Sequence, residues 1–273
     1  MTSFRTFILL LAAVSTAKAA TVYDVGSAVT AGNTGANTYF VSNQTGAGVT
    51  TGSSLGLTVG TSTGTTNTTY LVGYFPDVSL INVGDSISMS LSFSGPINAT
   101  NEAFRVGFYD SGNSQLTSNV TASNGSAVMK DYTGYSASLG ANTTPSASNT
   151  FKERSTSNNN LFSSSSYNSF SSPTLAGSVG STGSRNLTYT LELVATGVKM
   201  TIDYGTYSYS YIDTVTPYTN FDTFAIYSEK STSTTTSPTL TFTNLTISSV
   251  PEPSTFVLCA LGLGLLLRRR LRR

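Results

Sequence analysis

The sequence predicts an all-β protein, with one antiparallel β-sandwich domain between a targeting segment at each end of the chain. Several segments alternate strictly between apolar and polar side chains, which is the period of a strand with one buried face. Between the two ends no segment shows helical spacing over three turns. Only 10% of the 273 residues are charged, yet Tyr and Phe are plentiful enough to build a core. The roughly 230 residues between the ends suffice for one large domain.

The N-terminal residues have the composition of a secretory signal peptide. Arg5 precedes an apolar run at 7–14, and small residues follow up to Ala19, which is the pattern that a signal peptidase cuts. An apolar run of eight residues rises only about 12 Å, far less than the roughly 30 Å of a bilayer core. A membrane anchor is therefore the weaker interpretation, and we expect residues 1–19 to be a signal peptide cut near Ala19 or Ala20.

Strands are expected throughout the body of the chain. The clearest covers residues 86–94, where four apolar side chains alternate with serines between turn residues at 84–85 and 95–96. The last strand changes parity near Asn244, which predicts a β-bulge there. Weaker strands are expected at 22–25, 39–41 and 55–59, and stronger ones at 103–109, 186–194, 198–204, 207–211, 221–227 and 238–248.

The segment 186–204 is the strongest hairpin prediction, because two alternating strands flank a turn at Ala195–Gly197. Segments 111–125 and 142–172 are poor in apolar residues and are predicted to be long loops. Side chains of one parity should share a single core between the sheets. These are Ile87, Met89, Leu91, Phe93, Phe104, Val106, Leu191, Leu193, Met200, Ile202, Phe224, Ile226, Leu240 and Phe242.

Charge excludes several classes of function. Residues 20–249 carry seven Lys and Arg against twelve Asp and Glu, a formal charge of −5, so no nucleic-acid partner is expected. The only dense charge cluster of the body, Lys152-Glu153-Arg154, is interpreted as a solvated strand or loop face. The chain has no His and its single Cys is Cys259 in the tail. The usual general base, Cys-His or Ser-His pairs, His-based zinc sites and disulfides of the body are all excluded.

A glycan hydrolase would need two carboxylates about 5 Å apart for retention or about 6.5–9.5 Å apart for inversion. Glu192 stands alone on its strand, and Asp203 lies on the next one. A pair formed across the fold, such as Glu102 with Asp110, is left open. We nevertheless expect no enzymatic activity and no catalytic residues.

Metal binding is likewise not predicted. Asp110, Asn113 and Asp131 could donate oxygen ligands to calcium, but they lack a regular Asp-x-Asp-x-Asp spacing. Such residues more often make turns. We expect no metal and no cofactor.

Four tyrosines allow a binding function. Tyr204, Tyr207, Tyr209 and Tyr211 could stack on sugar rings, since each offers an apolar face and a hydroxyl group. Ordinary cross-strand packing is the favoured interpretation, because aromatic pairs stabilise sheets in any case. Carbohydrate stacking remains the alternative.

The C-terminus has three consecutive parts. Pro251-Glu252-Pro253 precedes an apolar run at 255–267, and basic residues end the chain: Arg268, Arg269, Arg270, Arg272 and Arg273. This arrangement closely resembles the PEP-CTERM sorting signal of Gram-negative bacteria. In that family the Pro-Glu-Pro motif, a hydrophobic helix and a basic end are recognised by an exosortase, a membrane cysteine protease. A plain tail anchor with a proline-rich hinge is the alternative.

The resemblance implies a transient membrane anchor. The 13-residue apolar run would form a short transmembrane helix that rises only about 20 Å. The arginines would stop translocation and stay cytoplasmic by the positive-inside rule, which places the body outside. Cys259 lies within the run and is interpreted as an apolar helix residue.

The order of strands resembles the laminin-G or concanavalin-A-like jelly roll. The resembling segments are 103–110, 131–135, 186–204, 221–227 and 240–247. Such folds serve as lectins, glycanases and adhesion modules alike, so this resemblance implies a fold more than a function.

Together these observations predict an exported, non-enzymatic protein of the cell envelope or exopolysaccharide matrix. Its expected partners are signal peptidase, an exosortase, the inner membrane transiently, and an exopolysaccharide or other glycan. A carbohydrate-binding module and a glycan-active enzyme are the alternatives. The predicted organisation is a signal peptide at 1–19, a jelly-roll sandwich at 20–249 and a sorting signal at 250–273.

Overall fold

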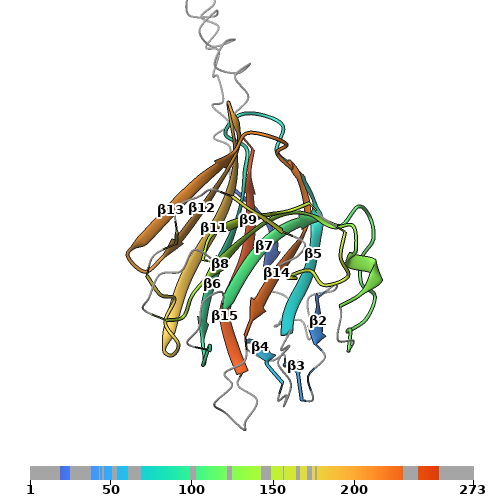
Figure 1. Ribbon diagram of the computed structural model, residues 1–273, viewed down its shortest axis with the longest axis vertical. Coiled ribbons are helices and arrows are strands. Elements are labelled where there is room, and N and C mark those ends of the chain that lie inside the picture. Colours follow the sequence, from blue (N-terminus) through green and yellow to red (C-terminus); the bar gives the residue numbers. More distant parts are fainter. Residues whose placement is uncertain are drawn as a thin grey trace, which may run out of the picture.

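The computed structural model describes residues 19–24, 38–42, 44, 46–50, 54–60, 69–98, 103–121, 125–142, 149–155, 157–163, 167–170, 174–175, 177–229 and 239–251. This part of the chain is all-β, as predicted. Two antiparallel sheets pack face to face, and one 3-10 turn, η1 (Ala127–Met129), lies beside them (Figure 1). Among these residues no helix is long and apolar enough to cross a membrane. The predicted tail helix and residues 1–18 of the predicted signal peptide lie outside the described residues.

The first sheet has eight strands in the order β13-β12-β11-β6-β15-β4-β3, with β1 paired to β15. Its centre is the predicted strand at 86–94, which lies between the predicted hairpin and the last strand. The strands are β13 (Tyr207–Asp213), β12 (Gly197–Tyr204), β11 (Ser184–Val194), β6 (Ser86–Ser94), β15 (Thr239–Val250), β4 (Leu55–Thr58), β3 (Gly48–Thr50) and β1 (Ala20–Asp24).

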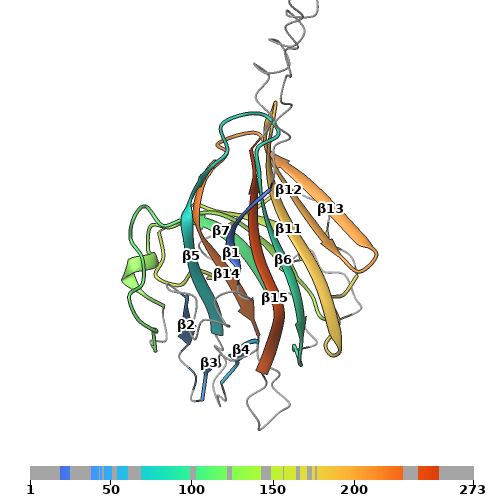
Figure 2. The same cartoon turned by 180° about the vertical axis from the view of Figure 1, so that it is seen from behind.

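The second sheet has seven strands in the order β10-β9-β8-β7-β14-β5-β2. Figure 2 shows the two sheets from behind, with β5, β7 and β14 on one side and β6, β11 and β15 on the other. The strands are β10 (Tyr167–Ser169), β9 (Phe151–Arg154), β8 (Thr133–Leu139), β7 (Phe104–Asp110), β14 (Asn220–Ser228), β5 (Thr69–Ser79) and β2 (Thr38–Ser42).

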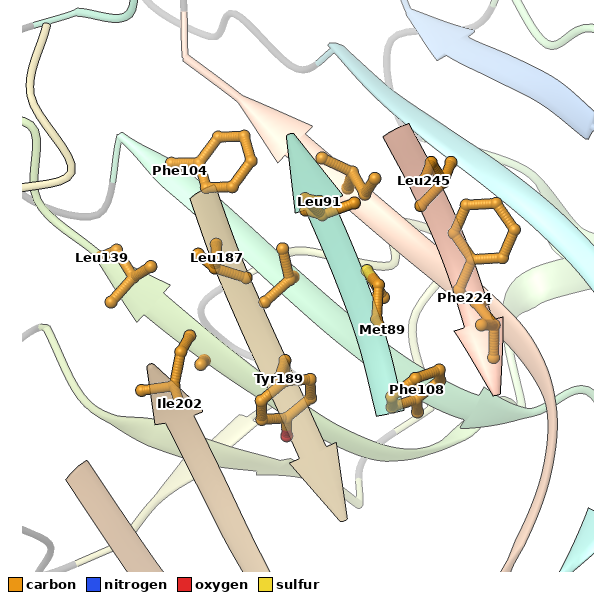
Figure 3. Packing of buried hydrophobic residues seen from close by; sticks show 14 of the residues in the cluster. Met89, Leu91, Phe104, Phe108, Leu139, Leu187, Tyr189, Ile202, Phe224 and Leu245 are labelled. Atoms are coloured by element: carbon orange, nitrogen blue, oxygen red, sulfur yellow. The ribbon is translucent and has the colours of Figure 1, made fainter. Parts of the chain in front are cut away.

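The predicted core fills the space between the sheets, and we call these buried side chains the inner cluster. Every side chain of the predicted core list is buried there except Leu193, which is partly buried at its border. Phe93 of β6 stacks on Phe104 of β7 with ring centroids 4.8 Å apart, so the sheets meet through aromatic contacts. Figure 3 shows this packing, with Met89 and Leu91 of β6 opposite side chains of the other sheet.

The predicted irregularity of the last strand is also present. The pairing of β15 with β6 shifts register between Phe242 and Asn244, which is a β-bulge at the predicted place. One extra residue there returns Leu245 to the buried face on which Phe242 lies. The bulge thus keeps both halves of a twelve-residue strand on the same core.

A second group of buried side chains covers the other face of the second sheet, and we call it the outer cluster. It lies beneath the connections at 111–121, 125–132 and 157–163. Strands β5 and β14 are therefore buried on both faces and carry nearly continuous apolar runs. The outer cluster consists of Val41, Tyr70, Val72, Tyr74, Tyr109, Leu116, Met129, Tyr132, Leu161, Phe162, Ala225 and Tyr227.

Two expectations about 142–172 are wrong. The segment is not one long loop, because it contains β9 and β10. Lys152-Glu153-Arg154 is not a solvated face either, since these side chains are 6%, 8% and 0% exposed on β9. The Arg154 guanidinium donates to the carbonyl oxygen of Met129 (3.0 Å) and to those of Tyr132 and Asn158. A charge can be buried when hydrogen bonds replace its water, and Arg154 does this by binding the loops that cover it.

Candidate functional site

The predicted sorting segment follows the last strand without a linker. Val250 still pairs with Ser86 of β6, and the exposed Pro251 is the next residue. Val250 and Pro251 border a groove of about 230 Å³ that Val22 and Leu80 also line. The other predicted motif residues, Glu252, Pro253, Arg268, Arg269, Arg270, Arg272 and Arg273, lie outside the described residues.

The first and last strands of the sandwich lie side by side. Strand β1 begins at Ala20, whose backbone partner on β15 is Ser249. The expected signal-peptidase site at Ala19 or Ala20 is therefore next to the start of the sorting motif. Figures 1 and 2 show β15 ending at the upper end of the first sheet, and Ala20, the first residue of β1, lies at this end because it pairs with Ser249.

The four tyrosines named from the sequence lie at one edge of the first sheet. Tyr204 ends β12, and the other three lie on the edge strand β13. Tyr204 is buried, whereas Tyr207 is 41% exposed. In the β12–β13 register Tyr207, Tyr209 and Tyr211 oppose Tyr204, Ile202 and Met200. Directly opposed side chains share a face of the sheet, so all four tyrosines point toward the core side. Figure 1 shows β13 at the outer edge of the first sheet, next to β12.

The tyrosine rings contact one another and their neighbours. Tyr207 and Tyr209 stack with centroids 6.4 Å apart and planes 12° from parallel. Tyr211 stacks on Phe170 at 4.9 Å, and Tyr209 and Tyr211 border the inner cluster. All four rings therefore have packing partners, since Tyr207 also lies 5.5 Å from the opposed Tyr204 ring. Tyr207 is nevertheless the ring that presents the most surface to solvent.

A groove of about 320 Å³ adjoins this row. Tyr204 lines it together with Arg185 and Asn186 of β11. The Arg185 guanidinium donates to the carbonyl oxygens of Gly180 (2.8 Å) and Gly95 and lies over the Phe93 ring at 4.9 Å, so it is fixed in place. Burial lowers the pKa of Arg185. The groove thus joins an aromatic ring, a guanidinium and a primary amide.

Of the three possible calcium donors, Asp110 and Asn113 line one groove of about 320 Å³, and Asp131 is not among the residues that line it. Asp110 accepts the Gly112 amide at 2.8 Å, and Asn113 has a left-handed backbone with φ 66°. Asp131 accepts the Ser157 hydroxyl at 2.8 Å. In the described ranges no group of three or more His, Cys, Asp or Glu side chains could hold a metal ion. Asp110 and Asn113 thus form a turn, whereas Asp131 binds a residue 26 positions away in the sequence.

One buried carboxylate near them was missed by sequence reasoning. Asp222 of β14 is 5% exposed and accepts the Ser111 amide (2.8 Å), the Ser111 hydroxyl and the Thr223 hydroxyl (2.7 Å). It fastens the connection after β7 to the sheet. No local pattern indicated this role, because Ser111 and Asp222 are 111 residues apart.

Glu192 and Asp203 do not form a hydrolase pair. The Glu192 carboxylate lies 4.0 Å from the Lys199 ammonium across the hairpin. Asp203 opposes Thr188, which precedes Glu192 by four residues on β11. At about 3.3 Å per residue this places them about 13 Å apart, beyond the range for either mechanism. Glu102 lies outside the described residues.

Another carboxylate pair, which sequence reasoning did not find, lies at the edge of the inner cluster. Asp213 accepts the Tyr135 hydroxyl at 2.7 Å, and Glu153 faces Tyr135 across the β8–β9 pair. Burial raises the pKa of Glu153, and the nearby charge of Asp213 raises it further. Burial also raises the pKa of Tyr135, so its hydroxyl stays protonated and donates. Both carboxylates are nearly inaccessible to solvent.

Comparison with known protein families identifies the tail. The PEP-CTERM protein-sorting motif matches residues 249–273. The chain thus carries the sorting motif of exported proteins that an exosortase processes. The match begins at Ser249, within β15, so the motif and the sandwich share their border. No curated protein matches the chain.

Solved structures show a distant likeness to the body. A peanut lectin bound to a nine-residue peptide has 9% identity and a TM-score of 0.43 over 80% of this chain and 93% of its own. Arcelin-5, a lectin-like defence protein from Phaseolus vulgaris, has 11% identity and a TM-score of 0.40 over 80% and 94%. The Emp46p carbohydrate recognition domain in its potassium-bound form has 9% identity and a TM-score of 0.46 over 77% and 88%.

Proposed function

We propose that this protein is an exported, non-enzymatic component of the cell envelope or exopolysaccharide matrix, built on a jelly-roll body. Signal peptidase removes residues 1–19, the tail at 255–267 holds the protein briefly in the inner membrane, and an exosortase then processes the C-terminus. The observation that carries the proposal is the PEP-CTERM match at 249–273. The position of Ala20 beside Ser249 supports it, because both signals then act at one end of a folded body.

The absence of catalysis is part of the proposal. Support comes from the carboxylates, since Glu192 binds Lys199 and Asp203 lies about 13 Å from Glu192 along the sheet. The chain also has no His. The wet faces of its strands are rich in Ser and Thr, which suits a body that stays soluble in a matrix without many charges.

The sorting role is tested by changing the motif. Pro251 and Pro253 hold the preceding residues extended, and Glu252 is the one charge between them, so Glu252→Ala should leave uncleaved protein in the inner membrane. The control is Asp203→Ala, which removes an exposed carboxylate from β12. Both variants are followed by membrane fractionation with an antiserum against the body, in cells with and without exosortase. Normal release of the Glu252→Ala protein would refute the role of the motif.

A second candidate function is carbohydrate binding by the body. The observation that favours it is the exposed Tyr207 ring beside the groove of Tyr204, Arg185 and Asn186. Aromatic faces stack on sugar rings while amide and guanidinium groups bind hydroxyls. A glycan array with the whole secreted protein tests this. Tyr207→Ala should abolish any signal, whereas Tyr211→Phe should keep it because the Tyr211 ring already packs on Phe170.

A further inference from the structure

Three aliphatic side chains stand in solvent at the end of the sandwich where β15 ends. Ile81 is 76% exposed, Val83 52% and Val215 84%. They lie in the β5–β6 and β13–β14 connections, which touch through a bond from the Leu80 amide to the Thr219 carbonyl (2.8 Å). Figure 1 shows both connections at the upper end of the molecule. Single exposed aliphatic side chains are common and need no explanation. Three of them in two touching connections do need one.

Both connections hold these side chains outward with a buried aspartate. Asp85 accepts the amide of Ile81 at 2.8 Å, and Asp213 accepts the amide of Val215 at 3.0 Å. The two aspartates are 5% and 2% exposed, respectively. The tips therefore have fixed backbones, and their aliphatic side chains are presented to solvent and do not fold back onto the sheets.

The path of the chain brings this end to a membrane. Strand β15 ends here at Val250, and the neighbouring strand β1 begins here at Ala20. Only residues 251–254 separate Val250 from the apolar run at 255–267. Five extended residues span at most about 17 Å. Whenever the run is inserted in a bilayer, the exposed aliphatic side chains must lie near its surface.

We propose that this end of the sandwich is a lipid-contacting surface, in which Ile81, Val83 and Val215 enter the membrane interface while the tail is inserted. The inference rests on the membrane anchoring in the proposed function. Neither 80–85 nor 214–219 contains Lys or Arg, so the contact is apolar and requires no anionic lipid. Such a contact would hold Pro251 at a fixed height above the bilayer for processing.

The test uses the full chain in vesicles of neutral phosphatidylcholine without any other protein. In a Cys259→Ser background, Ile81→Cys and Val215→Cys each carry an environment-sensitive fluorophore, and Thr206→Cys in the exposed β12–β13 turn is the control. We expect labels at 81 and 215 to shift their emission to the blue and to be quenched by spin-labelled lipids, equally at low and high salt. The label at 206 should keep its emission in water.

Vesicle flotation distinguishes membrane anchoring by the tail from lipid contact by the sandwich. If the chain floats but the labels at 81 and 215 stay water-like, the lipid contact is wrong and the anchoring stands. If the chain does not float, the anchoring fails and the contact fails with it. Protection of these labels only when exosortase is added to the vesicles would assign the surface to a protein and overturn the lipid contact.

Discussion

The inner and outer clusters of this protein are buried by different means. The inner cluster lies between two sheets whose alternating strands meet through apolar and aromatic contacts. The outer cluster lies between one sheet and three loop segments, and polar groups within it and beside it bind those loops. Tyr74 accepts the Leu116 amide at 2.9 Å, and Arg154 donates to loop carbonyls, among them those of Met129 and Asn158. A second sheet can cover the first by side-chain packing alone, because its backbone groups are already paired within the sheet. A loop that covers a sheet has unpaired backbone N–H and C=O groups, so it also needs polar side chains to bind them.

Breaking the inner cluster should have the largest effect. Leu91 is 2% exposed at the centre of β6, so Leu91→Asp would bury an unpaired charge and cost several kcal/mol. We expect this variant not to fold, as judged by denaturant unfolding and near-UV circular dichroism. The control is Ser90→Asp, one residue away on the other face of β6, which should melt close to the parent. Similar melting of Leu91→Asp and the parent would contradict the sandwich core.

Breaking the outer cluster should loosen only the loops. Removing the Arg154 guanidinium leaves buried carbonyl oxygens without donors, at about 1–3 kcal/mol each. We expect Arg154→Met to lose hydrogen-exchange protection at 125–132 and 157–163 while β6 and β11 stay protected. Arg154→Lys should be intermediate, since an ammonium group keeps the charge but not the planar fork. Uniform loss of protection over both sheets would mean that the two clusters unfold as one unit.

A single hydroxyl of the outer cluster offers a finer test. The Tyr74 hydroxyl lies 2.8 Å from the Tyr132 hydroxyl and accepts the Leu116 amide. Tyr74→Phe keeps the ring and removes these bonds, so it should lower the free energy of unfolding by about 1 kcal/mol. Tyr207→Phe, at the exposed ring of β13, should change it by less. Equal effects at the two positions would argue against a hydrogen-bonded cover.

The inner cluster could be predicted from the sequence, whereas the outer cluster could not. Alternation over 86–94 and 186–204 predicted the inner cluster, the hairpin and, from its break, the bulge of β15. Strand β5 was not predicted, because a strand buried on both faces shows no alternation. Lys152-Glu153-Arg154 appeared solvated, because its burial depends on loop carbonyls such as that of Asn158. The sorting motif was predictable because its residues are contiguous, whereas Asp222 and the Glu153–Asp213 pair depend on contacts distant in sequence.

The smallest expected effect lies at the edge of the inner cluster, where Glu153 of β9 faces Tyr135. Its pKa is raised above the ordinary value of 4.5 by burial and by Asp213. The folded chain therefore keeps this proton at pH values where the unfolded chain has lost it. Stability must fall as the pH rises from the unfolded value through the folded one, and the penalty is complete above that range.

Glu153→Gln removes the titration and keeps the size of the side chain. The Thr216 hydroxyl, 3.5 Å from Glu153, still has an oxygen to bind in the variant. We expect the variant and the parent to melt alike below about pH 4, where the carboxyl is protonated in both states, and the variant to melt higher as the pH approaches neutrality. Glu192→Gln, on the outer face beside Lys199, should not show this gain. If Glu153→Gln instead melts progressively lower than the parent with rising pH, the Glu153 carboxylate stabilises the fold. This edge of the inner cluster would then be stabilised by a charged group as well as by packing.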